Sequence, residues 1–312
     1  MHVHSHDHSH GRDRAGERRG LLLALVTTTV ILVAEAIGGW LSNSLALLAD
    51  AGHMFSDALA LGLAYAALAL AERPATRSKT YGWYRLEILA ALLNGAVLVA
   101  ISAFIVWEAW ERLMRPPEVD IPLMMVIALI GLVANALGLF FVSGHTHGLN
   151  MRGAYLHILG DLLSSVGVVL GGVAMWATGA MWVDPLLSVL ISVVIVIGAW
   201  RLLRESVDVL LEATPAGIDH LEVERRITAL NDVVGVHDLH IWCLTSGMNA
   251  LSCHVEVEEE CLPRCDALLD AIRHVAREEF QISHVTVQIE PKGYKSRQMI
   301  HWRLQANESH EH

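Results

Sequence analysis

Hydrophobic residues form long runs in most of this chain and short alternating runs near its C-terminal end. A helix needs about 20 predominantly apolar residues to cross the hydrocarbon core of a bilayer. Six stretches reach that length, with turn-forming or polar residues between them. The pattern therefore predicts six membrane-spanning helices, at 21–41, 45–71, 86–110, 121–142, 154–178 and 183–203.

The segment after the last predicted span has the pattern of a small soluble domain. Its periodicity predicts helices at 219–230 and 262–280. Alternation of apolar and polar residues predicts strands at 233–245, 249–258 and 284–290. This order suits an open sheet covered on one face by two helices. We therefore predict a six-helix all-α transmembrane bundle followed by a small α+β domain.

These patterns divide the chain into four parts. We expect a His-rich N-terminal arm at 1–20, the transmembrane domain at 21–204, the α+β domain at 205–292 and a tail at 293–312. The histidines of the arm alternate with small or acidic residues, and such tracts bind metal by composition. They are His2, His4, His6, His8 and His10.

Composition agrees with a membrane protein. Hydrophobic residues make up 54% of the chain, charged residues 18%, and the mean hydropathy is +0.44. An ordinary soluble domain has about 25% charged residues. The 33 acidic and 22 basic side chains give a net charge of −11, so the chain lacks the basic surface that nucleic acids need. This balance excludes a disordered or nucleic-acid-binding protein and disfavours a soluble enzyme.

Basic residues predict the orientation in the membrane. Only Arg112 and Arg115 lie in gaps on one side of the predicted spans, and the positive-inside rule puts that side outward. Both termini and the α+β domain are then cytoplasmic. The basic residues on the cytoplasmic side are Arg12, Arg14, Arg18, Arg19, Arg73, Arg77, Lys79, Arg85, Arg152, Arg201 and Arg204.

Two predicted spans carry the same pair of metal-binding side chains. His53 and Asp57 share one helix face in ADAGHMFSD, and His157 and Asp161 repeat the H-x-x-x-D spacing in HILGD. Ionisable groups inside a membrane are costly and usually functional. Two imidazoles and two carboxylates make the four ligands of a tetrahedral Zn²⁺ site. The alternative is that each pair only forms hydrogen bonds between helices.

Other polar side chains inside the spans have less specific roles. Asp50 is either a carboxylate that orients the ligands or an entry-path group, and a packed polar contact is the alternative. For Glu35 and Asn135 we expect hydrogen bonds between helices. No H-E-x-x-H motif occurs, and four protein ligands leave no position for a reactive water, so we expect no enzymatic activity.

Several motifs together resemble the cation diffusion facilitator family, most closely its bacterial zinc, cadmium and cobalt efflux members. They are SLALLADAGHMFSD, RPATRSKTYGWYRLEILAALLN, HILGDLLSSVGVV and VHDLHIWCLTSG. The resemblance extends over 21–290. It implies a homodimeric metal–proton antiporter that exports zinc across the plasma membrane, the inner membrane if the source is bacterial. It also implies a ferredoxin-like cytoplasmic domain that helps to dimerise the protein.

Residue by residue, the resemblance puts the transport site at His53, Asp57, His157 and Asp161. Relatives also bind regulatory zinc in the cytoplasmic domain, where Gln288 occupies a ligand position of some relatives. The residues that match or lie near such ligand positions are His240, His254 and Glu290, with His237 and His284. A role without metal stays open for these residues.

The remaining alternatives concern the cargo and the class of protein. Ligands of mixed nitrogen and oxygen character also accept Cd²⁺, Co²⁺, Ni²⁺ or Fe²⁺. A membrane sensor or scaffold that binds zinc without moving it is the other possibility. Cys261 and Cys265, one helical turn apart, are expected to be free thiols rather than metal ligands.

Overall fold

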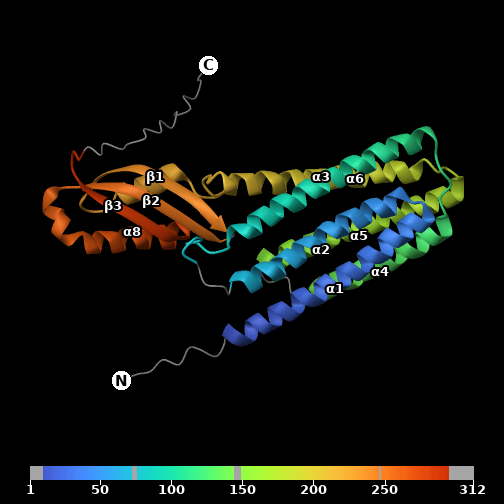
Figure 1. Cartoon of the computed structure of the whole chain (residues 1–312), viewed down its shortest axis with the longest axis horizontal. Helices are drawn as coiled ribbons and strands as arrows, with labels where there is room; N and C mark the ends of the chain where they lie inside the picture. Colours follow the sequence, from blue (N-terminus) through green and yellow to red (C-terminus); the bar gives the residue numbers. More distant parts are fainter. Residues whose placement is uncertain (1–9, 72–75, 144–148, 246, 295–312) are drawn as a thin grey trace, which may run out of the picture. The chain divides into compact units, whose positions relative to one another are not determined.

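The computed structural model describes residues 10–71, 76–143, 149–245 and 247–294 (Figure 1). Some side chains within the described helices, among them that of His157, lie outside this description. The chain forms two compact units, Met1–Ser206 and Val207–His312.

A helix lies at each of the six predicted spans of the first unit. Five of them are long and apolar enough to cross a membrane, counting described residues only. The other, α2, includes the polar segment with Asp50, His53 and Asp57, and several side chains in its second half lie outside the described residues. The helices are α1 (His10–Ser42), α2 (Leu45–Ala71), α3 (Arg85–Met114), α4 (Ile121–Ser143), α5 (Leu149–Thr178) and α6 (Val183–Leu210).

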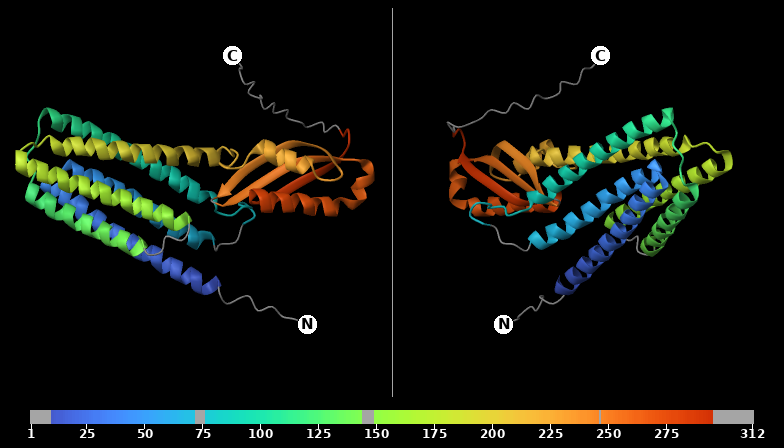
Figure 2. Two further views of the ribbon diagram at one scale, coloured as in Figure 1. Left: turned by 180° about the vertical axis from the view of Figure 1, so that it is seen from behind. Right: turned by 45° about the vertical axis from the view of Figure 1, so that its right-hand side comes forward.

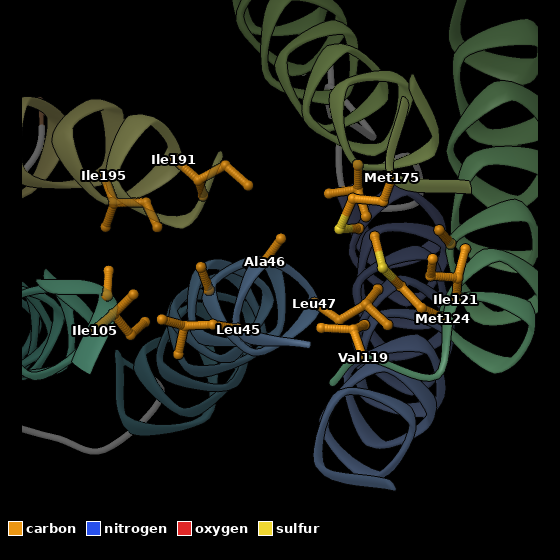
Figure 3. Close-up of a cluster of buried hydrophobic side chains, with 14 of the residues drawn as sticks. Leu45, Ala46, Leu47, Ile105, Val119, Ile121, Met124, Met175, Ile191 and Ile195 are labelled. Atoms are coloured by element: carbon orange, nitrogen blue, oxygen red, sulfur yellow. The ribbon is translucent and has the colours of Figure 1, made fainter. Parts of the chain in front are cut away.

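Packing within the first unit centres on α2. This helix contacts α1, α3 and α5, and α4 contacts both α1 and α5 (Figures 1 and 2). At the start of α2, Leu45 belongs to the same buried cluster as Ile105 of α3 and Ile195 of α6 (Figure 3). Leu47 extends that cluster toward Met175 of α5. The first turns of α2 therefore meet helices on two sides.

The second unit has the predicted order of helices and strands. Asp219 caps α7 by accepting a hydrogen bond from the Leu221 amide at 2.9 Å. A 3₁₀ turn at Glu259–Arg264 precedes α8, so the regular helix begins three residues later than predicted. The elements are α7 (His220–Thr228), β1 (Val233–Thr245), β2 (Met248–Val257), α8 (Cys265–Phe280) and β3 (Ile282–Pro291).

The sheet of the second unit has the order β1-β2-β3. The hairpin partners β1 and β2 are antiparallel, whereas β2 and β3 are parallel. A parallel pair needs a crossover connection, which α8 supplies. Apolar side chains of α7 and α8, such as Ile227 and Ile272, share one buried cluster with Leu251 and Val255 of β2. Both helices therefore cover one face of the sheet, as the α+β prediction requires.

None of the four cysteines of the second unit forms a disulfide within the part of the chain that the structure describes. Cys253 is only 1% exposed in the core, and burial raises the pKa of its thiol to about 12. Cys265 is half-buried at the start of α8. Since the thiolate is the reactive form, we expect iodoacetamide at pH 8 to modify Cys253 roughly a thousandfold more slowly than Cys265, because a pKa near 12 leaves almost no thiolate. Peptide mass spectrometry over a time course measures both rates.

The control for this experiment is the same reaction in urea, where unfolding should make the cysteine rates similar. Equal rates for Cys253 and Cys265 in the native protein would contradict the burial of Cys253.

Candidate metal centres

Helices α2 and α5 bring three of the four predicted intramembrane ligands together. His53 Nε2 lies 3.2 Å from Asp161 Oδ1 and 3.9 Å from Asp57 Oδ2. One ligand atom from each residue lies within 4.8 Å of the others. Around a tetrahedral zinc with bonds of about 2.0–2.2 Å, ligand atoms are roughly 3.3 Å apart. A small inward movement of these side chains would therefore complete three corners of a zinc site.

The fourth predicted ligand is His157. Its backbone belongs to α5, one turn before Asp161, but its side chain lies outside the described residues. Residues four apart share one face of an α-helix. The helical backbone therefore puts His157 on the helix face that carries Asp161.

Asp50 links the two ligand-bearing helices. It is 5% exposed, and its Oδ1 accepts a hydrogen bond of 2.7 Å from Ser164 Oγ of α5. A hydrogen-bonded carboxylate beside metal ligands orients them without binding the ion itself. Because this hydrogen bond joins Asp50 to Ser164 and not to a ligand, the orienting role stays a prediction beside that of a packed polar contact. Sequence patterns did not single out Ser164, because serines are common in membrane helices.

Two buried asparagines on neighbouring helices form hydrogen bonds with the helices that carry the candidate ligands. Asn94 of α3 donates a hydrogen bond of 2.9 Å to Ser56, the neighbour of Asp57. Asn135 of α4 donates one of 3.0 Å to Ser165 of α5. The interhelical hydrogen bond predicted for Asn135 is therefore confirmed.

Glu35 of α1 is a further buried carboxyl group in this unit. It is 2% exposed and packs against Gly131 of α4, where an added Cβ would lie 2.5 Å from Glu35 Oε1. Glu35 Oε2 has no hydrogen-bond partner among the described residues. It interacts electrostatically with Asp50, His53 and Asp161. The absence of a side chain at Gly131 is what makes room for this carboxyl group.

We expect Gly131→Ala to destabilise the protein. The new methyl group would collide with Glu35, and overpacking of a well-packed interior costs about 1–3 kcal/mol. Thermal unfolding in detergent should show a lower Tm. The control is Gly198→Ala, because a Cβ at Gly198 meets nothing within 4 Å. Alanine also favours a helix over glycine by about 1 kcal/mol, so a Tm of Gly131→Ala at or above that of Gly198→Ala would refute the steric argument.

A second group of possible ligands lies on the three-stranded sheet. His237 of β1 is the direct cross-strand partner of His254 of β2, and Glu256 of β2 pairs with Glu290 of β3. Glu290 Oε1 lies 2.9 Å from His254 Nδ1, and its Oε2 lies 3.3 Å from His237 Nε2. His237, His254 and Glu290 thus form one three-ligand cluster.

Glu290 is the buried member of this cluster, with a side chain 2% exposed. Gln288 Nε2 also donates a hydrogen bond of 2.7 Å to Glu290 Oε1. A carboxylate this deeply buried requires compensating partners. The Gln288 amide supplies one, but Glu290 Oε2, His237 Nε2 and His254 Nδ1 have no hydrogen-bond partner among the described residues.

A β-bulge in β1 separates His237 from His240 in the register with β2. The register with β2 shifts between His237 and His240, and Asp238 within the shift has a positive φ of 51°. His240 is exposed and lies 3.1 Å from Asp238 Oδ1, while Asp238 Oδ2 is 3.7 Å from His254 Nε2. The extra residue aligns His240 with Ser252, on the same face of the sheet as His237 and His254, but the His240 imidazole lies beside Asp238 and outside the three-ligand cluster.

His284 lies apart from this cluster. It is exposed on β3, where its register partner is Ala250. The structure thus brings together His237, His254 and Glu290 from the predicted candidates, and leaves His240 and His284 outside the three-ligand group.

Comparison with known proteins explains why a membrane bundle and a small sheet domain occur in one chain. The model of the cation efflux transmembrane domain matches residues 21–211, and that of the cation efflux protein cytoplasmic domain matches 215–292. The chain belongs to the cation efflux family. This family is the cation diffusion facilitators, so the resemblance seen in the motifs is confirmed.

Individual members of the family align with nearly the whole chain. The metal cation efflux system protein CzcD of Cupriavidus metallidurans is 42% identical over 92% of this chain and 89% of its own length. The zinc transporter ZitB of Escherichia coli is 42% identical over 93% and 92%. A cadmium, cobalt and zinc/H⁺-K⁺ antiporter of Bacillus subtilis is 41% identical over 90% and 92%.

Among solved structures, the metal-bound C-terminal domain of the CzcD transporter of Cupriavidus metallidurans is 40% identical to this chain. It covers 23% of this chain and 99% of its own, with a TM-score of 0.22.

Membership of the cation efflux family establishes the class of activity. The chain is a multi-pass membrane transporter that exports divalent metal cations, and it is not an enzyme. These findings confirm the predicted fold class and the predicted absence of enzymatic activity. They decide against the membrane sensor that the sequence had left open.

Proposed function

We propose that this cation efflux protein exports Zn²⁺ from the cytoplasm in exchange for protons. The cargo would bind at His53, Asp57, His157 and Asp161, and the site would open alternately to the two sides of the membrane. The observation that carries the proposal is the cluster of His53, Asp57 and Asp161, contributed by two helices within a membrane bundle.

The choice of zinc rests on the ligand types. Imidazole nitrogen suits zinc and related borderline metals better than Mg²⁺ or Ca²⁺, which prefer oxygen ligands. ZitB, one of the similar proteins, is named a zinc transporter. Cadmium and cobalt are the leading alternative cargoes, because the similar protein of Bacillus subtilis is named for all three metals.

Exchange for protons follows from the charge of the site. A Zn²⁺ ion held by Asp57 and Asp161 has no net charge, which lowers the cost of placing it inside a membrane. Its departure would leave two negative charges in that environment. Protons arriving at the same side chains restore neutrality, and a protonated imidazole does not bind metal. Metal and protons would therefore occupy the site in turn.

The location and assembly follow from the sequence and the family. The basic residues flanking the spans support a plasma membrane protein with both termini and the sheet domain in the cytoplasm, the inner membrane in a bacterium. We further propose that the chain is a homodimer, joined in part through its cytoplasmic domain. The cluster of His237, His254 and Glu290 would bind a regulatory zinc ion in that domain.

The test is zinc flux in proteoliposomes that contain the full-length protein. A zinc-sensitive dye and a pH-sensitive dye would be followed in the same vesicles. We expect an imposed pH gradient to drive zinc movement and zinc movement to drive protons in the opposite direction. Zinc flux that neither responds to the gradient nor moves protons would refute the exchange. Faster flux of Cd²⁺ or Co²⁺ than of Zn²⁺ would identify that metal as the main cargo.

A further inference from the structure

The first turn of α6 contains a buried carboxylate that sequence patterns did not single out. Asp184 is 1% exposed. Its side-chain hydrogen bonds with described residues all come from the start of α2. Ser44 Oγ donates to Oδ1 at 2.6 Å, the Leu45 amide donates to Oδ2 at 2.7 Å, and the Ala46 amide donates to Oδ1 at 3.3 Å. One end of α2 is thus held by a side chain of another helix.

These contacts satisfy backbone amides at the N-terminus of α2. The first amides of a helix have no partners within the helix, and a negative charge near them is favourable because of the helix dipole. Ser44 caps the same end, since its Oγ accepts a hydrogen bond from the Leu47 amide at 3.3 Å. Asp184 and Ser44 together satisfy the amides of Leu45, Ala46 and Leu47.

We propose that Asp184 is a positioning residue for the intramembrane metal site. It fixes the start of α2 against α6, and it thereby sets the height and rotation of α2 at His53 and Asp57 relative to Asp161 of α5. This inference rests on the proposed function, because it assigns a role to the helix that carries two of the transport ligands.

Distance excludes a direct role of Asp184 in metal binding. Leu45, which contacts Asp184, precedes His53 by eight residues. At about 1.5 Å of rise per residue, the two positions are roughly 12 Å apart along α2. An ion held by His53 is therefore out of reach of Asp184, whose effect must pass through the helix.

The surrounding contacts explain why such an anchor is needed. Leu45 meets Ile105 of α3 and Ile195 of α6 in an apolar cluster (Figure 3). Apolar contacts are not directional, so they allow α2 to rotate or slide at low cost. The Asp184 hydrogen bonds are directional, and a metal site needs its ligands within about 0.5 Å of their working positions.

The experiment compares zinc affinity in full-length variants. Zinc affinity is measured by competition with a chelator. The sites attributed to the membrane unit are those that are lost in Asp57→Ala. We expect Asp184→Ala to weaken zinc binding at these sites about 10- to 100-fold, the range seen when groups that orient metal ligands are lost. Asp184→Asn, which keeps the shape and one acceptor oxygen, should lie between Asp184→Ala and the native protein.

The matched control is Asp120→Ala. Asp120 caps α4 through the Leu123 amide at 3.1 Å, so it is also an acidic helix cap of the membrane unit, but among the described residues its side chain bonds to no second helix. We expect zinc affinity within about twofold of the native value, because losing one cap costs only about 1 kcal/mol of stability. Ser44→Ala combined with Asp184→Ala should weaken binding by less than the product of the single effects, because the two residues share one hydrogen bond.

Two results would overturn the positioning role. One is native affinity in Asp184→Ala while Asp57→Ala abolishes the site. The other is a shifted pH dependence of flux in Asp184→Asn, which would make Asp184 a proton-carrying group. The proposed function fails separately, if Asp57→Ala itself leaves zinc binding and flux unchanged.

Discussion

Zinc flux is expected to fall at least 100-fold when Asp161 or Asp57 is replaced by alanine. Each substitution removes one carboxylate from the cluster around His53, whose Nε2 lies 3.2 Å from Asp161 and 3.9 Å from Asp57. The binding free energy of a protein zinc site is about 10–16 kcal/mol, or roughly 3 kcal/mol for each of four ligands. Losing one ligand therefore corresponds to a loss of more than 100-fold in affinity. The loss also leaves the bound ion with a net positive charge, which the membrane interior opposes.

Initial rates in proteoliposomes would measure this effect, with the amount of inserted protein determined for each variant. Glu111→Gln is the control, because Glu111 is exposed on α3 and lies outside the cluster. His157→Ala tests the fourth ligand, and we expect a loss of similar size. Flux that survives in both aspartate variants would show that the transport site lies elsewhere.

The second large effect is expected at Glu290 in the sheet domain. Glu290→Gln keeps the size of the side chain but removes the charge that lies between His254 and His237. Without the carboxylate, the cluster keeps two neutral imidazoles, and its zinc affinity should fall about 100-fold by the same division among ligands. Equilibrium dialysis of the full-length protein should then show fewer tightly bound zinc ions.

Glu258→Gln is the matched control for Glu290→Gln. Glu258 forms an exposed ion pair of 2.7 Å with Lys292, close to the end of the sheet. Exposed pairs contribute little, so neither zinc binding nor folding should change. Unaltered zinc stoichiometry in Glu290→Gln would argue against a metal site on the sheet.

His240→Ala tests whether the zinc ligands are the cluster seen in the structure or the set predicted from the sequence, which included His240. Because His240 pairs with Asp238 outside the three-ligand group, we expect its loss to weaken zinc binding far less than the loss of Glu290. The same dialysis experiment measures both. A loss in His240→Ala as large as in Glu290→Gln would make His240 a ligand.

The sequence by itself determined the elements of this protein, its family and the side chains of its candidate transport site. Span length identifies a membrane helix without reference to its neighbours, because the bilayer has a fixed thickness. The H-x-x-x-D spacing places His53 and Asp57 on one face of α2 for the equally local reason that an α-helix has 3.6 residues per turn. The α+β domain followed from periodicity in the same way.

Tertiary structure decided how these elements meet. Strand register aligns His237 directly with His254 beside Glu290, whereas His240, beyond the extra residue at Asp238, is aligned with Ser252 and lies outside the cluster. Asp184 reaches the start of α2 across 139 positions of sequence. Bulges and helix contacts of this kind arise from packing between distant segments, and the local pattern around a residue does not contain the partner that packing brings to it.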